Sequence, residues 1–151
     1  MLAEMYQSVD AQKIKALRQE IADLAGRAAH PLPQMTDRSV WKIVNEHGLF
    51  TVHREMRLVG VLVMLKQPTL NDLLDCTLSS LIVESSQLLA DEVEQSLVRR
   101  AIEEARRWGV RHIDVTCEAT QMQLMKRYNS LLFRPLNTCT LRLAFGVEHT
   151  D

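Results

Sequence analysis

The side chains that most often do chemistry in proteins are scattered along this sequence. None of its histidines is paired with a cysteine or a carboxylate at the spacing of a metal-ligand set. No serine lies in the Gly-x-Ser-x-Gly pattern of a nucleophile elbow. The sequence therefore predicts no metal site and no serine-hydrolase site. The five histidines are His30, His47, His53, His112 and His149.

The three cysteines, Cys76, Cys117 and Cys139, follow no zinc-binding pattern either. An odd number of cysteines in a chain of 151 residues favours reduced thiols in a cytosolic compartment over a disulfide framework. Free cysteine is usually buried and inert. We therefore expect all three cysteines to lie in the core as small apolar side chains.

The candidates for a general base are the carboxylates Asp75, Glu84 and Glu118, which stand near the ends of apolar runs. None of them belongs to a specific pattern. A single carboxylate at the end of a strand is more often a turn or cap residue. The residues alone therefore assign a catalytic role to none of the three.

The composition indicates one soluble domain that spans residues 1–151. Hydrophobic residues make up 46% of the sequence and charged residues 25%, and the formal net charge is -1, as is typical of a globular domain. This balance gives no overall attraction to nucleic acid or to an anionic membrane. The longest apolar run, Leu58–Leu65, is too short to cross a bilayer, and the N-terminus lacks a secretion signal. We expect a cytoplasmic protein that binds neither membranes nor nucleic acid.

Apolar periodicity predicts two helices in the N-terminal part, at residues 9–26 and 37–47. Asp10 is the expected N-cap of the first helix, and Thr36 or Asp37 caps the second. The buried side of the first helix is expected to be Ile14, Leu17, Ile21 and Leu24, and that of the second Val40, Trp41 and Val44.

Strands and helices then alternate along the rest of the chain. A tight turn near Met56–Arg57 joins two strands of an antiparallel meander. The helix at residues 89–108 allows the strand after it to lie parallel to the strand before it. A further helix, at residues 121–132, is expected to end before Pro135. Strands are predicted within residues 1–9, 49–55, 58–66, 74–83, 112–117 and 138–145.

Two segments, together with this order of elements, resemble the GNAT family of N-acetyltransferases. Ser96–Val110 is similar to the helix of that family that lies on the cofactor side, and Met125–Leu136 is similar to its "xLYEKLGF" segment. The resemblance implies an α/β fold with a mostly antiparallel central sheet, a splayed parallel pair of strands and flanking helices. It also implies that acetyl-CoA enters between the strand ending near Val83 and the strand ending near Cys117.

The segment that corresponds to the family's pyrophosphate loop departs from the family pattern. In the family, two glycines let phosphate approach the backbone at the start of the long helix. Here the loop is Leu89–Glu94, with Glu92 and Glu94 at the glycine positions, or Gln87–Glu92, with Ala90 and Glu92 there. Carboxylates at a helix N-terminus stabilise the helix but repel a pyrophosphate. If the site is active, the resemblance assigns cofactor binding to the backbone of Leu89, Ala90, Val93 and Glu94.

The resemblance also gives Tyr128 the place of the family's catalytic tyrosine, five residues before Phe133. In that role Tyr128 is the general acid that protonates a departing thiolate. Leu132 stands where the family has a glycine. The alternative is a tyrosine packed on a helix face, with its hydroxyl at the surface.

Two interpretations of function remain. The leading one is a non-catalytic GNAT-like protein, without a cofactor, that acts through contacts with other protein subunits in a homo- or hetero-oligomeric assembly. A structural or assembly component such as a bacteriophage virion protein is one form of it. The alternative is an acetyl-CoA-dependent N-acetyltransferase acting on a primary amine. The segment Gln87–Glu94 separates the two, since only the enzyme needs free backbone donors there.

Overall fold

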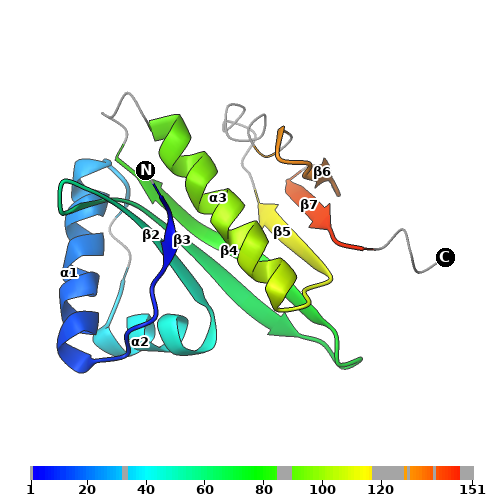
Figure 1. The fold of residues 1–151 in the computed structure, drawn as a ribbon, viewed down its shortest axis with the longest axis horizontal. Helices are drawn as coiled ribbons and strands as arrows, with labels where there is room; N and C mark the ends of the chain where they lie inside the picture. Colours follow the sequence, from blue (N-terminus) through cyan, green and yellow to red (C-terminus); the bar gives the residue numbers. More distant parts are fainter. Residues whose placement is uncertain are drawn as a thin grey trace.

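A central sheet carries helices on both of its faces in the computed structural model (Figure 1). The structure describes residues 2–31, 34–84, 90–116, 128, 130–137 and 139–146. The helices within these ranges are α1 (Ala11–Arg27), α2 (Asp37–Glu46) and α3 (Ala90–Arg107). The strands are β1 (Glu4–Met5), β2 (Gly48–Arg54), β3 (Arg57–Pro68), β4 (Leu74–Val83), β5 (His112–Thr116), β6 (Arg134–Pro135) and β7 (Thr140–Ala144).

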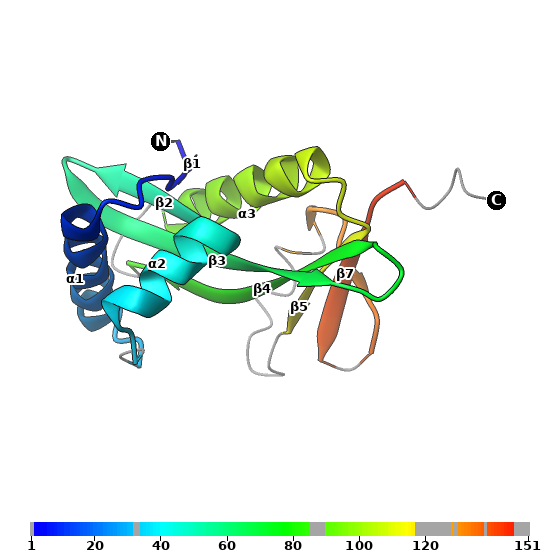
Figure 2. The same ribbon diagram turned by 90° about the horizontal axis from the view of Figure 1, so that it is seen from below.

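The strands form one sheet in the order β1-β2-β3-β4-β5-β7-β6. Within the described ranges every neighbouring pair is antiparallel except β4 and β5, which are parallel and joined through α3. Figure 2 shows α3 on one face of the sheet and α1 and α2 on the other. The predicted fold class, a mostly antiparallel sheet with one parallel pair and flanking helices, is confirmed.

Local sequence signals explain why the helices begin where they do. The Asp10 carboxylate accepts hydrogen bonds from the backbone N–H groups of Gln12 and Lys13, and so caps α1. Thr36 caps α2 through a reciprocal capping box with Ser39. Both N-caps were predicted, Thr36 being one of two candidates.

Each face of the sheet has its own apolar core. Val93, Leu97 and Val98 of α3 pack with alternate residues of β2 to β5 and β7 on one face. The opposite faces of β2, β3 and β4 pack against α1 and α2. Alternation along the strands therefore separates the two cores, as the period of two requires.

The parallel pair β4 and β5 separates beyond its first residues. The paired positions are Cys76 with Ile113, Thr77 with Asp114 and Leu78 with Val115. Beyond Leu78, β4 continues to Val83 in register with β3, and among the described residues it has no further pairing with β5. The carboxyl ends of β4 and β5 therefore diverge, and the predicted splay is confirmed.

Three details differ from the sequence-based predictions. Trp41 is 41% exposed, because the buried side of α2 is formed by Val40 together with the half-buried Ile43 and Val44. These three residues have the spacing of one helical face, whereas Trp41 is turned about 100° away from Val40. The prediction that Trp41 is buried was wrong.

The other two differences lie near the C-terminus. Cys139 is exposed, whereas Cys76 is buried as expected. The Asn137 side chain accepts hydrogen bonds from the backbone N–H groups of Cys139 and Thr140, and this turn leaves Cys139 outside the strand. Arg134–Pro135 form β6, a strand that was not predicted, beyond a turn at Leu131–Leu132. Most of the predicted helix at 121–132, and Cys117, lie outside the described residues.

Candidate functional site

A cavity of about 210 Å³ lies where β4 leaves β5. Its apolar lining comes from strands β3, β4 and β5, and its polar lining includes three hydroxyl side chains of β4 and β5. The apolar residues are Leu62, Leu78, Leu81 and Val115, and the polar ones are His30, Ser79, Ser80, Thr116 and Tyr128. The divergence of the parallel strands thus creates a pocket with both apolar and hydrogen-bonding walls.

Tyr128 forms part of the cavity wall. Its relative exposure is 2%, so the alternative of a hydroxyl at the surface does not fit the structure. The ring packs edge-on against Phe133, with ring centroids 5.1 Å apart and an interplanar angle of 67°. The Tyr128 carbonyl accepts hydrogen bonds from the N–H groups of Leu131 and Phe133. Aromatic packing and the turn that follows Tyr128 together fix the ring at the cavity.

His30 also lines the cavity, although the sequence analysis gave it no role. It follows α1 directly, and no motif surrounds it. The signal for the site was the resemblance, which placed the acyl group between the strands and did not extend to the chain after α1. Ser79, Ser80 and Thr116 lie on the two strands between which the resemblance placed acetyl-CoA, and they were missed because no motif singles out individual residues there.

The candidate base carboxylates lie elsewhere. Glu84 is buried between two arginines, with its Oε1 atom 2.6 Å from Arg27 Nε and its Oε2 atom 2.9 Å from an Arg57 guanidinium nitrogen. Asp75 forms two hydrogen bonds with Arg111, of 3.0 and 2.8 Å. Neither carboxylate lines the cavity. Glu118 lies outside the described residues.

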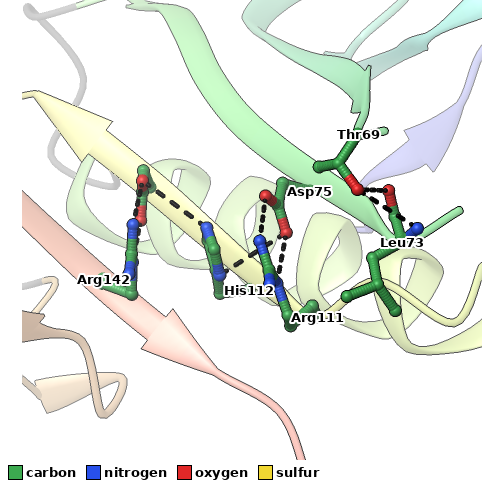
Figure 3. Close-up of polar contacts among 7 residues, drawn as sticks. Thr69, Leu73, Asp75, Arg111, His112 and Arg142 are labelled. Atoms are coloured by element: carbon green, nitrogen blue, oxygen red, sulfur yellow. Dashed lines mark hydrogen bonds and ion pairs between the residues drawn. The ribbon is translucent and has the colours of Figure 1, made fainter. Parts of the chain in front are cut away.

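A polar cluster joins β4, β5 and β7 near the start of β4 and β5 (Figure 3). His112 stands between two ion pairs, Asp75–Arg111 and Asp114–Arg142, with its Nδ1 atom 3.5 Å from Asp75 and its Nε2 atom 3.8 Å from Asp114. The hydrogen bond from Arg111 lowers the pKa of Asp75, whereas burial lowers the pKa of His112. The Asp75–Arg111 pair links β4 to the residue before β5, and the Asp114–Arg142 pair links β5 to β7, both at the end of the sheet away from the splay.

Helix α3 begins near the open end of the splayed pair. Asp91 and Glu92 lie exposed in its first turn, whereas Val93 is buried. Glu94, the next candidate, is partly buried. Of the four residues named for cofactor binding, Ala90, Val93 and Glu94 are therefore brought to the N-terminal turn of one helix. Leu89 lies outside the described residues.

Two kinds of site are not found in the part of the chain that the structure describes. No group of three or more histidine, cysteine or acidic side chains is arranged to hold a metal ion there. Among the same residues, no helix has the length and apolar character needed to cross a membrane.

The fold has close counterparts among solved structures. A ribosomal-protein-alanine N-acetyltransferase from Brucella melitensis superposes with a TM-score of 0.73 at 16% identity, over 96% of this chain and 100% of that chain. An aminoglycoside 6'-acetyltransferase type Ii gives 0.74 at 14% identity, over 95% and 97%. A transcriptional regulator from Bacillus halodurans C-125 gives 0.67 at 20% identity, over 89% and 95%.

These likenesses confirm the predicted GNAT fold, and at such identities they show the fold alone. No protein-family model matches the sequence, and no curated protein matches it. Since one fold carries many functions, the function has to be argued from the site.

Proposed function

We propose that this protein is an acetyl-CoA-dependent N-acetyltransferase that acts on a primary amine. The observation that carries the proposal is the cavity between the diverging ends of β4 and β5, with Tyr128 buried in its wall. Two of the three solved structures described above are acetyltransferases by name. The non-catalytic interpretation gave no reason for a polar cavity at this place.

The cavity fits the reacting end of the proposed substrate. Acetyl-CoA supplies an acetyl group activated as a thioester. The apolar side chains of Leu78 and Val115 would contact the chain next to the thioester, and the hydroxyls of Ser79 and Thr116 offer hydrogen bonds to its polar groups. Tyr128 would donate its phenolic proton to the departing sulfur. The edge-on packing against Phe133 holds the phenolic oxygen in place.

The acidic first turn of α3 would weaken the binding of acetyl-CoA without excluding it. A helix N-terminus offers backbone N–H donors to phosphate. Asp91 and Glu92 are exposed, so water screens their repulsion to about 1 kcal/mol for each charge pair at 4 Å. That corresponds to roughly a fivefold loss of affinity for each carboxylate. We expect the double variant Asp91→Asn, Glu92→Gln to bind acetyl-CoA about ten- to thirtyfold more tightly than the wild type.

The same acidic turn is the one observation that favours the competing interpretation, a non-catalytic protein acting through protein contacts. Acidic residues in the first turn stabilise α3 without any ligand. Under that interpretation acetyl-CoA binds neither the wild type nor the neutralised variant.

Thermal unfolding with and without acetyl-CoA tests the proposal first. A ligand present at 100 times its dissociation constant adds about 2.7 kcal/mol to the free energy of unfolding, which raises the midpoint by several degrees. Acetyl transfer is then measured with two primary amines, a peptide with an amino-terminal alanine and kanamycin. Absence of both a thermal shift and transfer would overturn the proposal.

The role of Tyr128 is tested with Tyr128→Phe, which keeps the ring and removes the proton. We expect kcat to fall about 100-fold or more, with the dissociation constant for acetyl-CoA nearly unchanged. Tyr6→Phe is the matched control, because the Tyr6 hydroxyl bonds only to the Lys13 carbonyl among the contacts described, and neither residue lines the cavity. Equal kcat values for the two variants would contradict a role for Tyr128 as acid.

A further inference from the structure

The loop after α1 brings a histidine to the same cavity. His30 lines it together with Ser79, Ser80, Thr116 and Tyr128. Among the described lining residues, His30 and Tyr128 are the titratable ones, and no carboxylate is among them. Histidine is the side chain that most often accepts protons in catalysis near neutral pH. The cavity therefore holds one group suited to donate a proton and one suited to accept it.

The backbone of His30 is held in place by the end of α1. Its N–H group donates to the Ala25 carbonyl at 3.0 Å, and the Ala28 N–H donates to Leu24 at 2.9 Å. Between them Ala29 adopts a left-handed conformation, with φ at 51°. This conformation is unfavourable for a residue with a Cβ atom, so the hydrogen bonds around it fix the direction in which the chain leaves the helix. His30 is the residue that this turn presents.

The C-terminal end of α1 is held in place by contacts with the strands. Arg27 binds the buried Glu84 carboxylate at 2.6 Å and the Leu58 carbonyl at 2.7 Å. Glu84 directly follows β4, the strand whose divergence opens the cavity. The position of His30 relative to β4 is therefore set by a buried ion pair, three residues away along the chain.

A hydrogen bond determines which nitrogen of His30 can accept a proton. The Nδ1 atom lies 2.9 Å from the Pro31 carbonyl oxygen. A carbonyl oxygen only accepts, so this contact is a hydrogen bond in the tautomer that carries the hydrogen on Nδ1, and in that neutral form Nε2 keeps its lone pair. This is the tautomer that a general base requires, with the basic nitrogen at the far end of the ring.

We propose that His30 is the general base of the acetyl transfer, which rests on the proposed function above. Nε2 of His30 takes a proton from the amine of the acceptor. The amine nitrogen forms a bond to the carbonyl carbon, the carbon–sulfur bond breaks, and the sulfur keeps the bonding pair and takes the Tyr128 proton. The proton on His30 leaves to solvent and Tyr128 is reprotonated, so the products are an amide and a free thiol.

The tautomer is testable without any substrate. A two-bond proton–nitrogen correlation spectrum of the free protein, assigned by comparison with His30→Gln, reports which ring nitrogen carries the hydrogen. We expect the Nδ1–H form for His30 over the range in which the ring is neutral. A neutral ring protonated on Nε2 would overturn the proposal, because its basic nitrogen would then point at Pro31.

Kinetics test the role directly with the alanine peptide and kanamycin as acceptors. His30→Gln should lower kcat about 100-fold at neutral pH and leave the affinity for acetyl-CoA within about twofold. Added imidazole should restore transfer in His30→Ala but not in Tyr128→Phe. His53→Gln, an exposed histidine on β2 in contact with Glu20, is the matched control.

The outcomes separate the two proposals. Transfer by the wild type with kcat unchanged in His30→Gln would overturn the role of His30 and leave the proposed function standing. No transfer by the wild type to either amine, with no binding of acetyl-CoA, would overturn both. Loss of activity in His30→Ala without rescue by imidazole would indicate a structural role and also overturn the proposal.

Discussion

Gly60 of β3 lies so close to Val93 of α3 that a Cβ atom at position 60 would stand 2.5 Å from the Val93 Cγ1 atom. It would also stand 3.0 Å from the Leu97 Cδ1 atom. The first turns of α3 therefore rest directly on the backbone of β3, and no side chain separates the two elements there. This close approach fixes the N-terminal turn of α3, where the proposed cofactor would bind.

We expect Gly60→Ala to lower the free energy of unfolding by about 1–3 kcal/mol, because the added methyl group forces buried side chains or the helix to shift. Gly26→Ala is the control, since a Cβ atom at position 26 in α1 meets nothing within 4 Å. That change should stabilise the protein slightly, by about 0.5–1 kcal/mol. Urea unfolding of both variants measures the two values, and equal effects would contradict the packing argument.

The ion pair between Glu84 and Arg27 gives a second prediction. The Glu84 side chain is only 3% exposed, whereas Arg27 and Arg57 remain 30% and 54% exposed. Glu84→Gln leaves the arginines access to water, so we expect a loss of about 1–3 kcal/mol, less than for a fully buried pair. Arg27→Met leaves the buried carboxylate with fewer partners and should cost more.

Chemical unfolding of both variants and of the wild type checks this order. Glu20→Gln serves as the reference for an exposed pair, because Glu20 and His53 are each more than 40% exposed. Its effect should stay within about 0.5 kcal/mol. A smaller loss for Arg27→Met than for Glu84→Gln would show that the buried carboxylate does not depend on Arg27.

Periodicity was sufficient to predict most of the fold. Leu74–Val83 was predicted as a strand with the bounds that the structure gives. The parallel arrangement of β4 and β5 followed from the helix between them. Such features are set by local patterns, which a single sequence contains.

The cavity could not be predicted in the same way. The position of His30 at the cavity depends on the left-handed conformation of Ala29 and on the ion pair between Arg27 and Glu84, which are far apart in the sequence. No local sequence pattern indicates either feature. Trp41 and Cys139 were misplaced for a related reason. The exposure of Trp41 depends on the width of the buried face of α2, and that of Cys139 on the hydrogen bonds that the Asn137 side chain accepts from the Cys139 and Thr140 N–H groups.

Leu132 provides a prediction about backbone strain. It has a φ of 75° and is 62% exposed, so it adopts a left-handed conformation and buries little apolar surface. Such a conformation costs a residue with a Cβ atom about 1–2 kcal/mol. Leu132→Gly should therefore stabilise the protein by about 0.5–1 kcal/mol after the greater freedom of glycine in the unfolded chain is counted.

The matched variant for this position is Leu132→Ala, which removes the same exposed side chain but keeps the Cβ atom. It should show no gain in the thermal midpoint. If alanine stabilises as much as glycine, the benefit comes from removing an exposed leucine, and the strain argument is wrong.

The surroundings of His112 predict how stability depends on pH. Burial lowers its pKa below the usual 6.5, and Asp75 offsets this only in part. The folded chain then binds fewer protons than the unfolded chain, so the free energy of unfolding decreases as pH falls through about 6.5 and levels off below the folded pKa. Asp75 itself, its pKa held below 3.8 by Arg111, adds stability that is lost only in more acidic solution. The ion pair of Asp114 and Arg142 also lies beside the His112 ring.

His47 contributes to the same upper step, since burial lowers its pKa and its Nδ1 atom accepts a hydrogen bond from the Lys66 N–H group. Protonation of His47 removes that acceptor. We therefore expect urea midpoints between pH 7.5 and pH 5 to fall less steeply in His112→Gln and in His47→Gln than in the wild type, and least steeply in the double variant. His53→Gln, whose ring is exposed, should keep the wild-type slope. If the urea midpoint of the double variant falls with pH as steeply as that of the wild type, other groups cause the loss of stability in acid. The ring of His112 would then gain water or a partner when it is protonated.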